Sequence, residues 1–263
     1  KHLLLLNVVL FIGCTQKQKS PKKFRYHIKC NIISDYSDID FTDIVKEYKM
    51  IKLETNEECL LDEIKKLVAH RGNFYIQANY LYCFNKKGEF IYKIANQGRG
   101  PGEFIHIQDF SLKGDTLYLY DNHGTKINMY DCATGEYLDK RKVIHSSHEM
   151  EVKDEFLYYN RLSIPNDLIE DDNSDMIIAH KMNKPKEIST HFPLNQTLEK
   201  GPNQLIKTNN KVLWIARYTC NVLKMNKQDI INYLEFDFGK KNISRDEITS
   251  GKIESMTQLT GEK

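Results

Sequence analysis

The sequence predicts an all-β protein, a β-propeller built from four-stranded blades. The chain of 263 residues has 15 Tyr and 12 Phe but one Trp, and such a content of aromatic side chains favours strands, whose half-buried pleated surface they fit. From about residue 70 onward, short aromatic or β-branched runs alternate with turn residues, and few apolar residues recur at helical spacing. Units of several strands that recur every ~40 residues are typical of propeller blades, and we count about four of them.

A hairpin signature that occurs twice supports the repeat. Residues 81–84 are followed by a turn that ends in Gly88 and then by residues 89–94. Residues 129–138 repeat the order aromatic, Asn or Asp, turn, Gly, Glu, aromatic, aliphatic, with one extra turn residue. Glycine at these positions allows the positive φ that tight hairpin turns require. Five further runs are predicted as strands: residues 116–120, 156–159, 176–179, 212–216 and 233–238.

A second repeated signature precedes two of the strand clusters. Residues 100–105 and 201–206 both read Gly-Pro, a turn residue, Glu or Gln, an apolar residue and Ile. The stretch around the first copy lacks the glycine spacing, the Lys and the helix of a phosphate-binding loop. We therefore interpret it as a rigid turn between blades, formed by Gly98, Gly100, Pro101 and Gly102.

These motifs resemble a known family. The stretch Gly-Arg-Gly-Pro-Gly-Glu-Phe at residues 98–104, followed by Asp109-Phe110 and later by Leu213-Trp214 and residues 236–239, is similar to the six-bladed, NHL-like β-propeller lipoproteins of Bacteroidetes. The resemblance covers about residues 55–243 and implies the fold and the compartment, but no biochemical activity. Six blades would make this chain incomplete at its C-terminal end, and we expect no closing strand at either end, since residues 242–263 are polar.

The beginning of the chain predicts export and lipidation. Residues 3–12 form an apolar run that suits a signal peptide and is too short to span a bilayer as a helix. Residues 11–14, Phe-Ile-Gly-Cys, resemble a bacterial lipobox, which would place a lipid on Cys14. The alternative is a buried first strand with Cys14 in the core. The expected division is a signal peptide at 1–13, a lipidated tether at 14–23 and the propeller domain at 24–263.

The lipid on Cys14 would tie the mature protein to a membrane, and the expected location is the outer membrane of the cell envelope. Residues 15–19 contain no acidic residue, which favours the periplasmic face. A formal net charge of +2 and the absence of a basic stripe exclude nucleic acid as the expected partner.

The sequence contains no motif for catalysis, a metal or a cofactor. Residues 145–149 hold two His and a Glu without zinc-hydrolase spacing. Residues 171–175 resemble a calcium loop, but Met176 and Met182 occupy the Gly and Glu positions of that loop. The five cysteines besides Cys14 form no C-x-x-C pair, so we expect buried thiols or a single disulfide rather than a zinc site.

The residues expected near the mouth of a central channel are Arg99, Glu103, His106 and Asp109, which follow the inter-blade turn and enter an innermost strand. The alternative is that Glu103 and Arg99 cap and pair within the turn. Residues 57–68 have helical spacing although the resemblance starts the first blade there, so helix and strand both stay open.

The functional hypotheses from this sequence are three. The first is a lipid-anchored binding module that recognises a glycan, a peptide or another envelope protein. The second is a periplasmic hydrolase or lyase with a site in the propeller channel, since such sites gather scattered residues and leave no local motif. The third is a scaffold.

Overall fold

The structure is a computed structural model, and it describes residues 24–29, 42, 45–143, 147–160, 175–182, 188–193, 204–208, 211–215, 221–227 and 229–237. The expected signal peptide, Cys14 and the expected tether lie outside these residues, as does the polar tail at 242–263. Within the described ranges, no helix has the length and apolarity needed to cross a membrane.

The described strands form four sheets in which consecutive strands pair antiparallel. The first sheet contains β2 (Lys66–His70), β3 (Asn73–Gln77), β4 (Leu81–Asn85) and β5 (Phe90–Ile94), and the second contains β6 (Ile107–Lys113), β7 (Thr116–Asp121), β8 (Lys126–Asp131) and β9 (Tyr137–Lys142). The third contains β10 (Met150–Lys153), β11 (Phe156–Asn160), β12 (Asp175–Lys181) and β13 (Ile188–Pro193). The fourth contains β14 (Gln204–Lys207), β15 (Val212–Ile215), β16 (Asn221–Asn226) and β17 (Asp229–Asp237).

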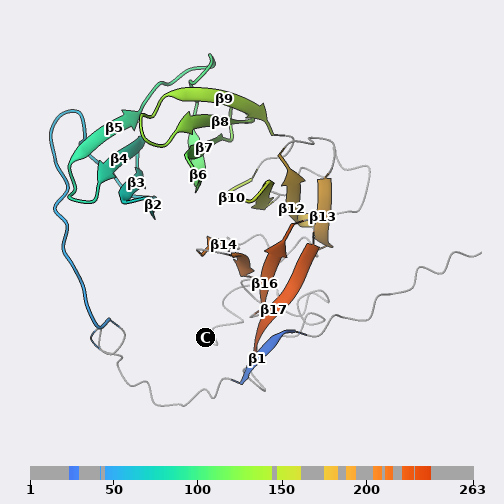
Figure 1. Ribbon diagram of the computed structural model, residues 1–263. Coiled ribbons are helices and arrows are strands. Elements are labelled where there is room, and N and C mark those ends of the chain that lie inside the picture. The colour runs from blue at the N-terminus through green and yellow to red at the C-terminus, as the bar shows by residue number, and fades with distance from the viewer. Residues whose placement is uncertain are drawn as a thin grey trace, which may run out of the picture.

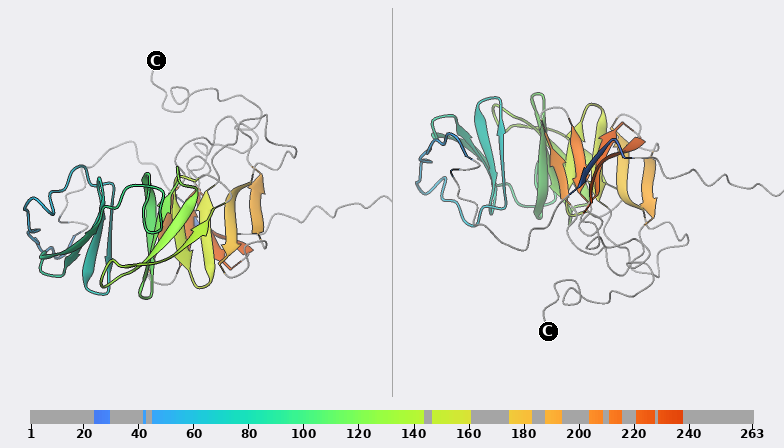
Figure 2. Two further views of the ribbon diagram at one scale, coloured as in Figure 1. Left: turned by 90° about the horizontal axis from the view of Figure 1, so that it is seen from above. Right: turned by 90° about the horizontal axis from the view of Figure 1, so that it is seen from below.

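The four sheets follow one another around an arc, as propeller blades do (Figure 1). The first strand of each sheet, β2, β6, β10 and β14, lies on the inner side of the arc, and the later strands lie progressively farther out. Seen from above and below, the sheets stand side by side (Figure 2). The predicted all-β class and four-stranded sheets are confirmed, whereas the described sheets make an arc and not a closed ring. The total of six blades stays a prediction.

The fourth sheet corrects one expectation. We expected no closing strand at either end of the chain, but β1 (Tyr26–Lys29) pairs parallel with β17, with Tyr26 opposite Leu234. The physical reason is the free edge of the nine-residue strand β17, whose backbone groups need partners. The N-terminal segment therefore becomes the fifth strand of the last sheet.

Apolar side chains fill the spaces between neighbouring sheets. Tyr75 and Leu81 of the first sheet pack with Phe110 and Leu117 of the second. Corresponding clusters lie between the second and third sheets and between the third and fourth. Each sheet is too small to bury both its faces alone, so the sheets stabilise one another in sequence along the arc.

The outer face of the first sheet has no preceding sheet beside it and is covered by the chain that leads into it. Leu53, Cys59 and Leu61 pack against the buried side chains of this face, which include Ile76 and Phe84. Residues 56–59 form a turn and β2 begins at Lys66, so the question left open for residues 57–68 is answered in favour of a loop followed by a strand.

The predicted turns and thiols are confirmed where the structure describes them. Gly88 and Gly135 close the two repeated hairpins with φ of 88° and 73°. Cys59, Cys83 and Cys132 are buried free thiols. Burial raises the pKa of Cys83 and Cys132 to about 11, which keeps both thiols protonated and unreactive at neutral pH.

Candidate functional site

Polar side chains gather where the innermost strands of successive sheets lie side by side. These strands run in the same direction, because Asp109 and Ser111 of β6 meet Met150 and Val152 of β10 in the same order. Among the residues of this cluster, Asp109, Ser111 and Glu151 are almost fully buried, with 5%, 2% and 5% of their surface exposed. A buried polar cluster at the centre of such an arc is the first candidate site.

The acceptors of this cluster bind the free backbone edge of the next strand. Asp109 Oδ2 accepts the Met150 N–H at 2.7 Å, and Ser111 Oγ accepts the Val152 N–H at 3.0 Å. One sheet farther along, Glu149 Oε2 accepts the Leu205 N–H at 2.7 Å. An inner strand has a partner strand on one side only, so these side chains supply the hydrogen bonds that a further strand would make.

Two lysines complete the cluster as donors. Lys66 Nζ lies 2.8 Å from Asp109 Oδ1 and from the Phe110 carbonyl, and 3.4 Å from Glu151 Oε1. Lys207 Nζ donates to the carbonyls of Leu112 and Val152, the latter at 2.8 Å. The lysines of the first and fourth sheets therefore satisfy inner-edge carbonyls of the second and third.

Burial and neighbouring charges shift the pKa values of these groups in opposite directions. Burial raises the pKa of Asp109 and of Glu151 although Lys66 stabilises both carboxylates. Burial also lowers the pKa of Lys207. Burial would lower the pKa of Lys66 too, but Asp109 and Glu151 attract its ammonium strongly enough to raise the pKa overall. The cluster combines paired charges with a desolvation cost that the pairing offsets only in part.

A pocket of about 300 Å³ opens between the first and second sheets, on the face of the arc at which the inner strands begin. Its walls come from the segment before β2, the turn between β3 and β4, and the start of β6. Its lining combines carboxylates, an ammonium, an amide and an imidazole with two apolar side chains: Asp62, Glu63, Lys65, Ala78, Asn79, His106 and Ile107. This volume is at the lower end of the usual range for small-molecule sites, and convergent polar groups are what such sites use for recognition.

The imidazole in this pocket has its own neighbours. The rings of His106 and His123 lie 5.4 Å apart between centroids. Burial lowers the pKa of His106, Lys65 and His123 add to this effect, and Asp121 opposes it. His106 is therefore predominantly neutral at neutral pH and can donate or accept a hydrogen bond.

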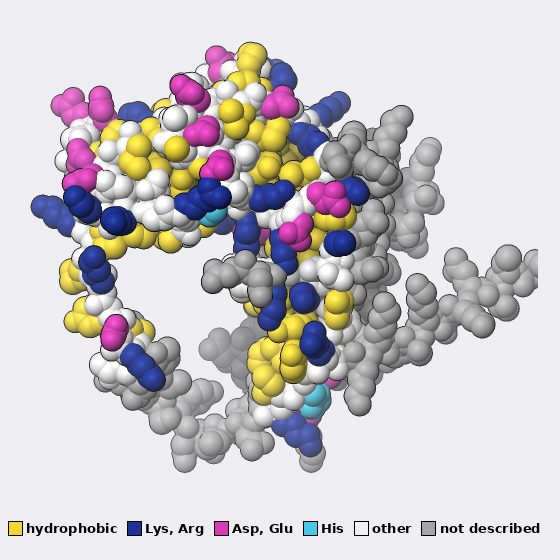
Figure 3. All heavy atoms as spheres, in the orientation of Figure 1, with side chains coloured by type: hydrophobic (Ala, Val, Ile, Leu, Met, Phe, Trp, Pro, Cys, Tyr) yellow, Lys and Arg dark blue, Asp and Glu magenta, His cyan; other side chains and the backbone are white. Residues whose placement is uncertain are grey.

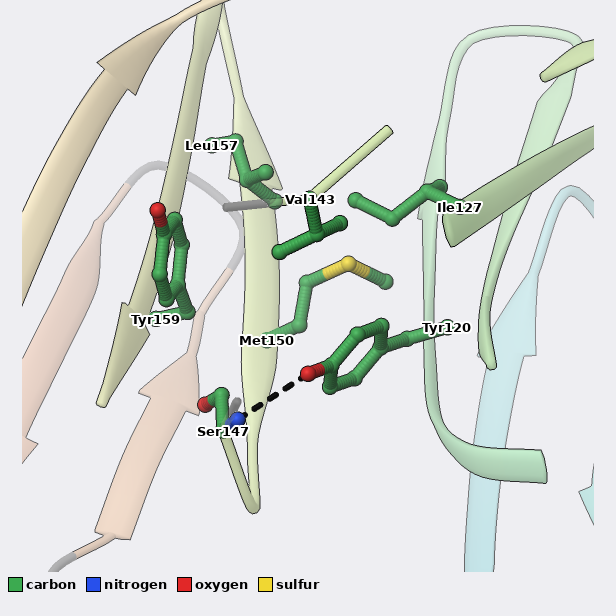
Figure 4. Close-up of a pocket in the computed structure, with 7 residues that line it drawn as sticks. All are labelled: Tyr120, Ile127, Val143, Ser147, Met150, Leu157 and Tyr159. Carbon is green, nitrogen blue, oxygen red and sulfur yellow. Dashed lines mark hydrogen bonds between the residues drawn. The ribbon is translucent and has the colours of Figure 1, made fainter. Parts of the chain in front are cut away.

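A second cavity lies between the second and third sheets and is much smaller, at about 10 Å³ (Figure 4). Apolar side chains such as Ile127, Met150 and Leu157 surround it, and the Ser147 N–H donates to the Tyr120 hydroxyl at 2.9 Å on its border. A cavity of this size has room for about one water molecule and is a packing gap rather than a ligand site.

The structure separates the four residues that the sequence placed near a channel mouth. His106 lines the pocket and Asp109 belongs to the buried cluster. Glu103 caps the turn instead, because its Oε2 accepts the Gly100 N–H at 2.7 Å, and Arg99 is exposed on the same turn. The capping role that we left as the alternative for Glu103 is what the geometry shows, and ligand contact by the four residues stays a prediction.

The glycine turn acts through its backbone. Gly102 has φ of 70°, and a Cβ there would lie 3.0 Å from the side chain of Tyr137. Any side chain on Gly98 or Gly100 would meet the carboxylate of Glu103. This crowding fits the predicted rigid turn between blades, and Pro101 is exposed within it.

The sequence reasoning missed Lys66, Ser111, Glu151 and Lys207. A signal was present: Lys113, Lys153 and Lys207 each end an inner strand immediately before its hairpin turn. Counting back two residues from the first two of these positions gives Ser111 and Glu151, and counting back four gives Asp109 and Glu149. Aligning the blades on this lysine would have found Ser111, Glu151 and Lys207, but not Lys66, because β2 ends in His70.

Two of the motifs weighed as metal sites lie partly outside the described residues. His145 and residues 171–174 lie outside the described residues. In the part of the chain that the structure describes, no three His, Cys, Asp or Glu side chains come close enough together to hold a metal ion.

The sheets and the cluster define an all-β protein with a propeller-like arrangement of its sheets. The chain belongs to the DUF4934 family, a domain family of unknown function, whose profile matches residues 26–262. No curated protein matches the chain.

One solved structure shows the same fold, and two others are less similar. A predicted exported protein of Bacteroides fragilis is 17% identical with a TM-score of 0.68, and the match covers 90% of this chain and 67% of that one. A DUF4221 member from Bacteroides vulgatus is 10% identical with a TM-score of 0.47, covering 75% and 64%. A β-propeller domain from Myceliophteria thermophila is 8% identical with a TM-score of 0.41, covering 64% and 55%. The chain thus spans about two thirds or less of the length of these proteins.

Proposed function

We propose that the protein is an exported binding module of the cell envelope that holds its ligand in the pocket between the first and second sheets. The pocket carries this proposal, because about 300 Å³ lined by Asp62, Glu63, Lys65, Asn79 and His106 suits a small polar ligand such as one or two sugar rings or a peptide end. The similar protein of Bacteroides fragilis is described as exported, which supports the envelope as the compartment.

Attachment and orientation extend the same proposal. A lipid on Cys14 would hold the module on the outer membrane, facing the periplasm, with glycans, peptides or other envelope proteins within reach. The full protein would be a closed propeller of six blades, in agreement with the resemblance noted from the motifs.

A binding experiment tests the pocket. The protein from residue 24 onward is applied to an array of glycans and short peptides, together with a double variant, Asn79→Ala with His106→Ala. Lys140→Ala, an exposed change on β9, is the matched control. We expect binding to be lost in the double variant and kept in the control. Equal binding by all three proteins, or no binding by the unchanged protein, would reject the pocket as the site.

The hydrolase or lyase alternative is supported by one observation. Asp109 and Glu151 have raised pKa values in a buried setting, as general acids in active sites do. Their oxygens are, however, already bound to Met150, Ser111 and Lys66, which favours a structural role. Turnover of a bound glycan that stops in Glu151→Gln without loss of binding would reverse this assignment.

A further inference from the structure

The pocket between the first and second sheets carries charged side chains that have no partner within the described part of the chain. Asp62, Glu63 and Lys65 line this pocket and are exposed. Among the described residues, none of these three side chains makes an ion pair or a hydrogen bond. In the buried cluster, by contrast, Lys66 and Asp109 pair with each other at 2.8 Å. The charged groups of the pocket are therefore available to a ligand.

The balance of charge in the lining favours a ligand with an ammonium group. Two carboxylates face one ammonium, and the imidazole of His106 is predominantly neutral, because burial lowers its pKa. Lys65 and His123 lower this pKa further, and only Asp121 opposes them. Asp121 is itself fully buried, and its oxygens accept three backbone N–H groups. The lining therefore has one negative charge in excess, which a ligand ammonium would neutralise.

An oriented amide gives the pocket hydrogen-bond donors. Asn79 Oδ1 accepts the Tyr80 N–H at 3.0 Å and the Tyr82 hydroxyl at 2.7 Å. A backbone N–H can only donate, so the oxygen of the amide, and not its nitrogen, faces Tyr80. The amide nitrogen of Asn79 keeps two N–H groups, and no acceptor among the described residues binds them. These groups and the Lys65 ammonium are donors that the pocket offers to the oxygen atoms of a carboxylate.

The surroundings of the pocket favour a ligand that carries negative as well as positive charge. The pocket adjoins the inner side of the arc, because Lys65 and His106 directly precede the inner strands β2 and β6. In the space-filling view, Lys and Arg side chains gather along this inner side (Figure 3). They would repel a ligand with positive charge alone, and they would attract the anionic group of a ligand that has both charges.

We propose that the ligand of this pocket is a small zwitterion, a free amino acid or a dipeptide. Its ammonium group would meet the two carboxylates of the pocket, and its carboxylate would meet Lys65 and Asn79. Ala78 and Ile107 form the apolar part of the lining, which suits a small apolar side chain such as that of alanine. This inference rests on the proposed function and narrows its ligand, since a neutral sugar would leave the three charged groups without a partner.

Isothermal titration calorimetry of the protein from residue 24 onward tests the proposal with probes that differ by one charge. L-Alanine and L-alanyl-L-alanine carry both charges, their N-acetyl derivatives lack the ammonium group, and their amides lack the carboxylate. We expect at least one parent compound to bind, and each of its derivatives to have a Kd about tenfold higher or more. Equal binding of a parent and its derivatives, or no binding by either parent, overturns the proposal. This comparison uses the unchanged protein, so it does not depend on the folding of a variant.

A double variant assigns the ammonium group to its partners. Asp62→Asn with Glu63→Gln should raise the Kd of the parent compound about tenfold or more, but not that of its N-acetyl derivative, which has no ammonium group to lose. Glu57→Gln with Glu58→Gln removes the same charge from exposed positions outside the lining and is the matched control. If the double variant binds the parent as tightly as the control does, the proposal falls. Thermal melts establish that both variants are folded.

Lys65→Gln tests the carboxylate of the ligand in the same way. The Kd of the parent compound should rise and that of its amide should not, with Lys140→Gln on β9 as the control. A neutral glycan that binds, and loses its binding in Asn79→Ala with His106→Ala, would keep the pocket as a site; if neither parent compound bound, the zwitterion alone would be rejected. No binding by any glycan, peptide or amino acid would reject the proposed function as well.

Discussion

The hydrogen bonds that Asp109 accepts predict a large loss of stability when this side chain is removed. Asp109 is buried and accepts hydrogen bonds from Lys66 Nζ, the Phe110 N–H and the Met150 N–H at 2.7 to 2.8 Å. In Asp109→Ala, the Met150 N–H is left without its acceptor, which costs about 1 to 3 kcal/mol. The Lys66 ammonium also loses its nearest carboxylate, and breaking a buried pair costs about 3 to 5 kcal/mol in fully buried cases.

Lys66 keeps the Phe110 carbonyl and Glu151 as partners and is partly exposed, so the lower end of these ranges applies. We expect Asp109→Ala to lower the free energy of unfolding by about 3 to 4 kcal/mol. Removing the ammonium as well, with Lys66→Met, should restore about 1 to 2 kcal/mol of this loss.

Urea denaturation of the protein, both single variants and the double variant gives the coupling free energy. A loss below about 1 kcal/mol in Asp109→Ala would show that the carboxylate does not hold the free edge of β10. A large loss without coupling to Lys66 would leave the backbone contacts as the whole effect, and the ion pair would then contribute nothing measurable.

Three further outcomes follow from the same structure. Burial raises the pKa of Glu151 above that of the unfolded chain, so between the two pKa values the folded carboxyl binds more protons than the unfolded one. The free energy of unfolding, relative to that of Glu151→Gln, should therefore fall as pH rises from about 4 through the folded pKa. Urea midpoints of the two proteins that move together between about pH 4 and 7 would contradict this. Gly102→Val should lower the free energy of unfolding by about 1 to 3 kcal/mol, because Gly102 has positive φ and its Cβ would crowd Tyr137; a melting temperature equal to that of the unchanged protein would show that the turn relaxes. Detergent partitioning of full-length protein made in a bacterial host should be lost in Cys14→Ala, while protease added to whole cells should leave the unchanged protein intact; partitioning that is equal in the two, or digestion in whole cells, would reject lipidation or the periplasmic orientation respectively.

The sequence predicted the elements of this fold well and the site poorly. Strands such as β4, β7 and β15 can be predicted from aromatic and branched runs between turn residues, because this signal is local and needs no tertiary information. The partner of β1 could not be predicted, because a four-residue strand that pairs with residues more than 200 positions later leaves no local pattern.

The residues of the buried polar cluster are harder to predict, again because their partners are far away in the sequence. Lys66 binds residues of β6 and β10 that are 43 to 85 positions away, so no spacing in the chain marks the cluster. Asp109 was predicted because it follows the glycine turn, whereas its partners depend on how the inner strands align. Glu103 belongs to the same stretch and binds only three residues back, at Gly100, which is why a local alternative described it correctly.

An arc of four sheets leaves a free strand edge on its last sheet and an uncovered apolar face on its first sheet. Contacts of the N-terminal region cover both. The free edge of β17 would offer unpaired backbone groups to another chain, and β1 occupies that edge. The apolar face of the first sheet would be open to water, and residues that precede β2, including Leu53 and Leu61, cover it. Inside the arc, where a strand could add to each inner edge, Asp109, Ser111 and Glu149 occupy the backbone donors instead. Polar side chains on the inner strands are thus required by the fold itself, and a functional role is best sought where such side chains exceed that need, in the pocket at the end at which the inner strands begin.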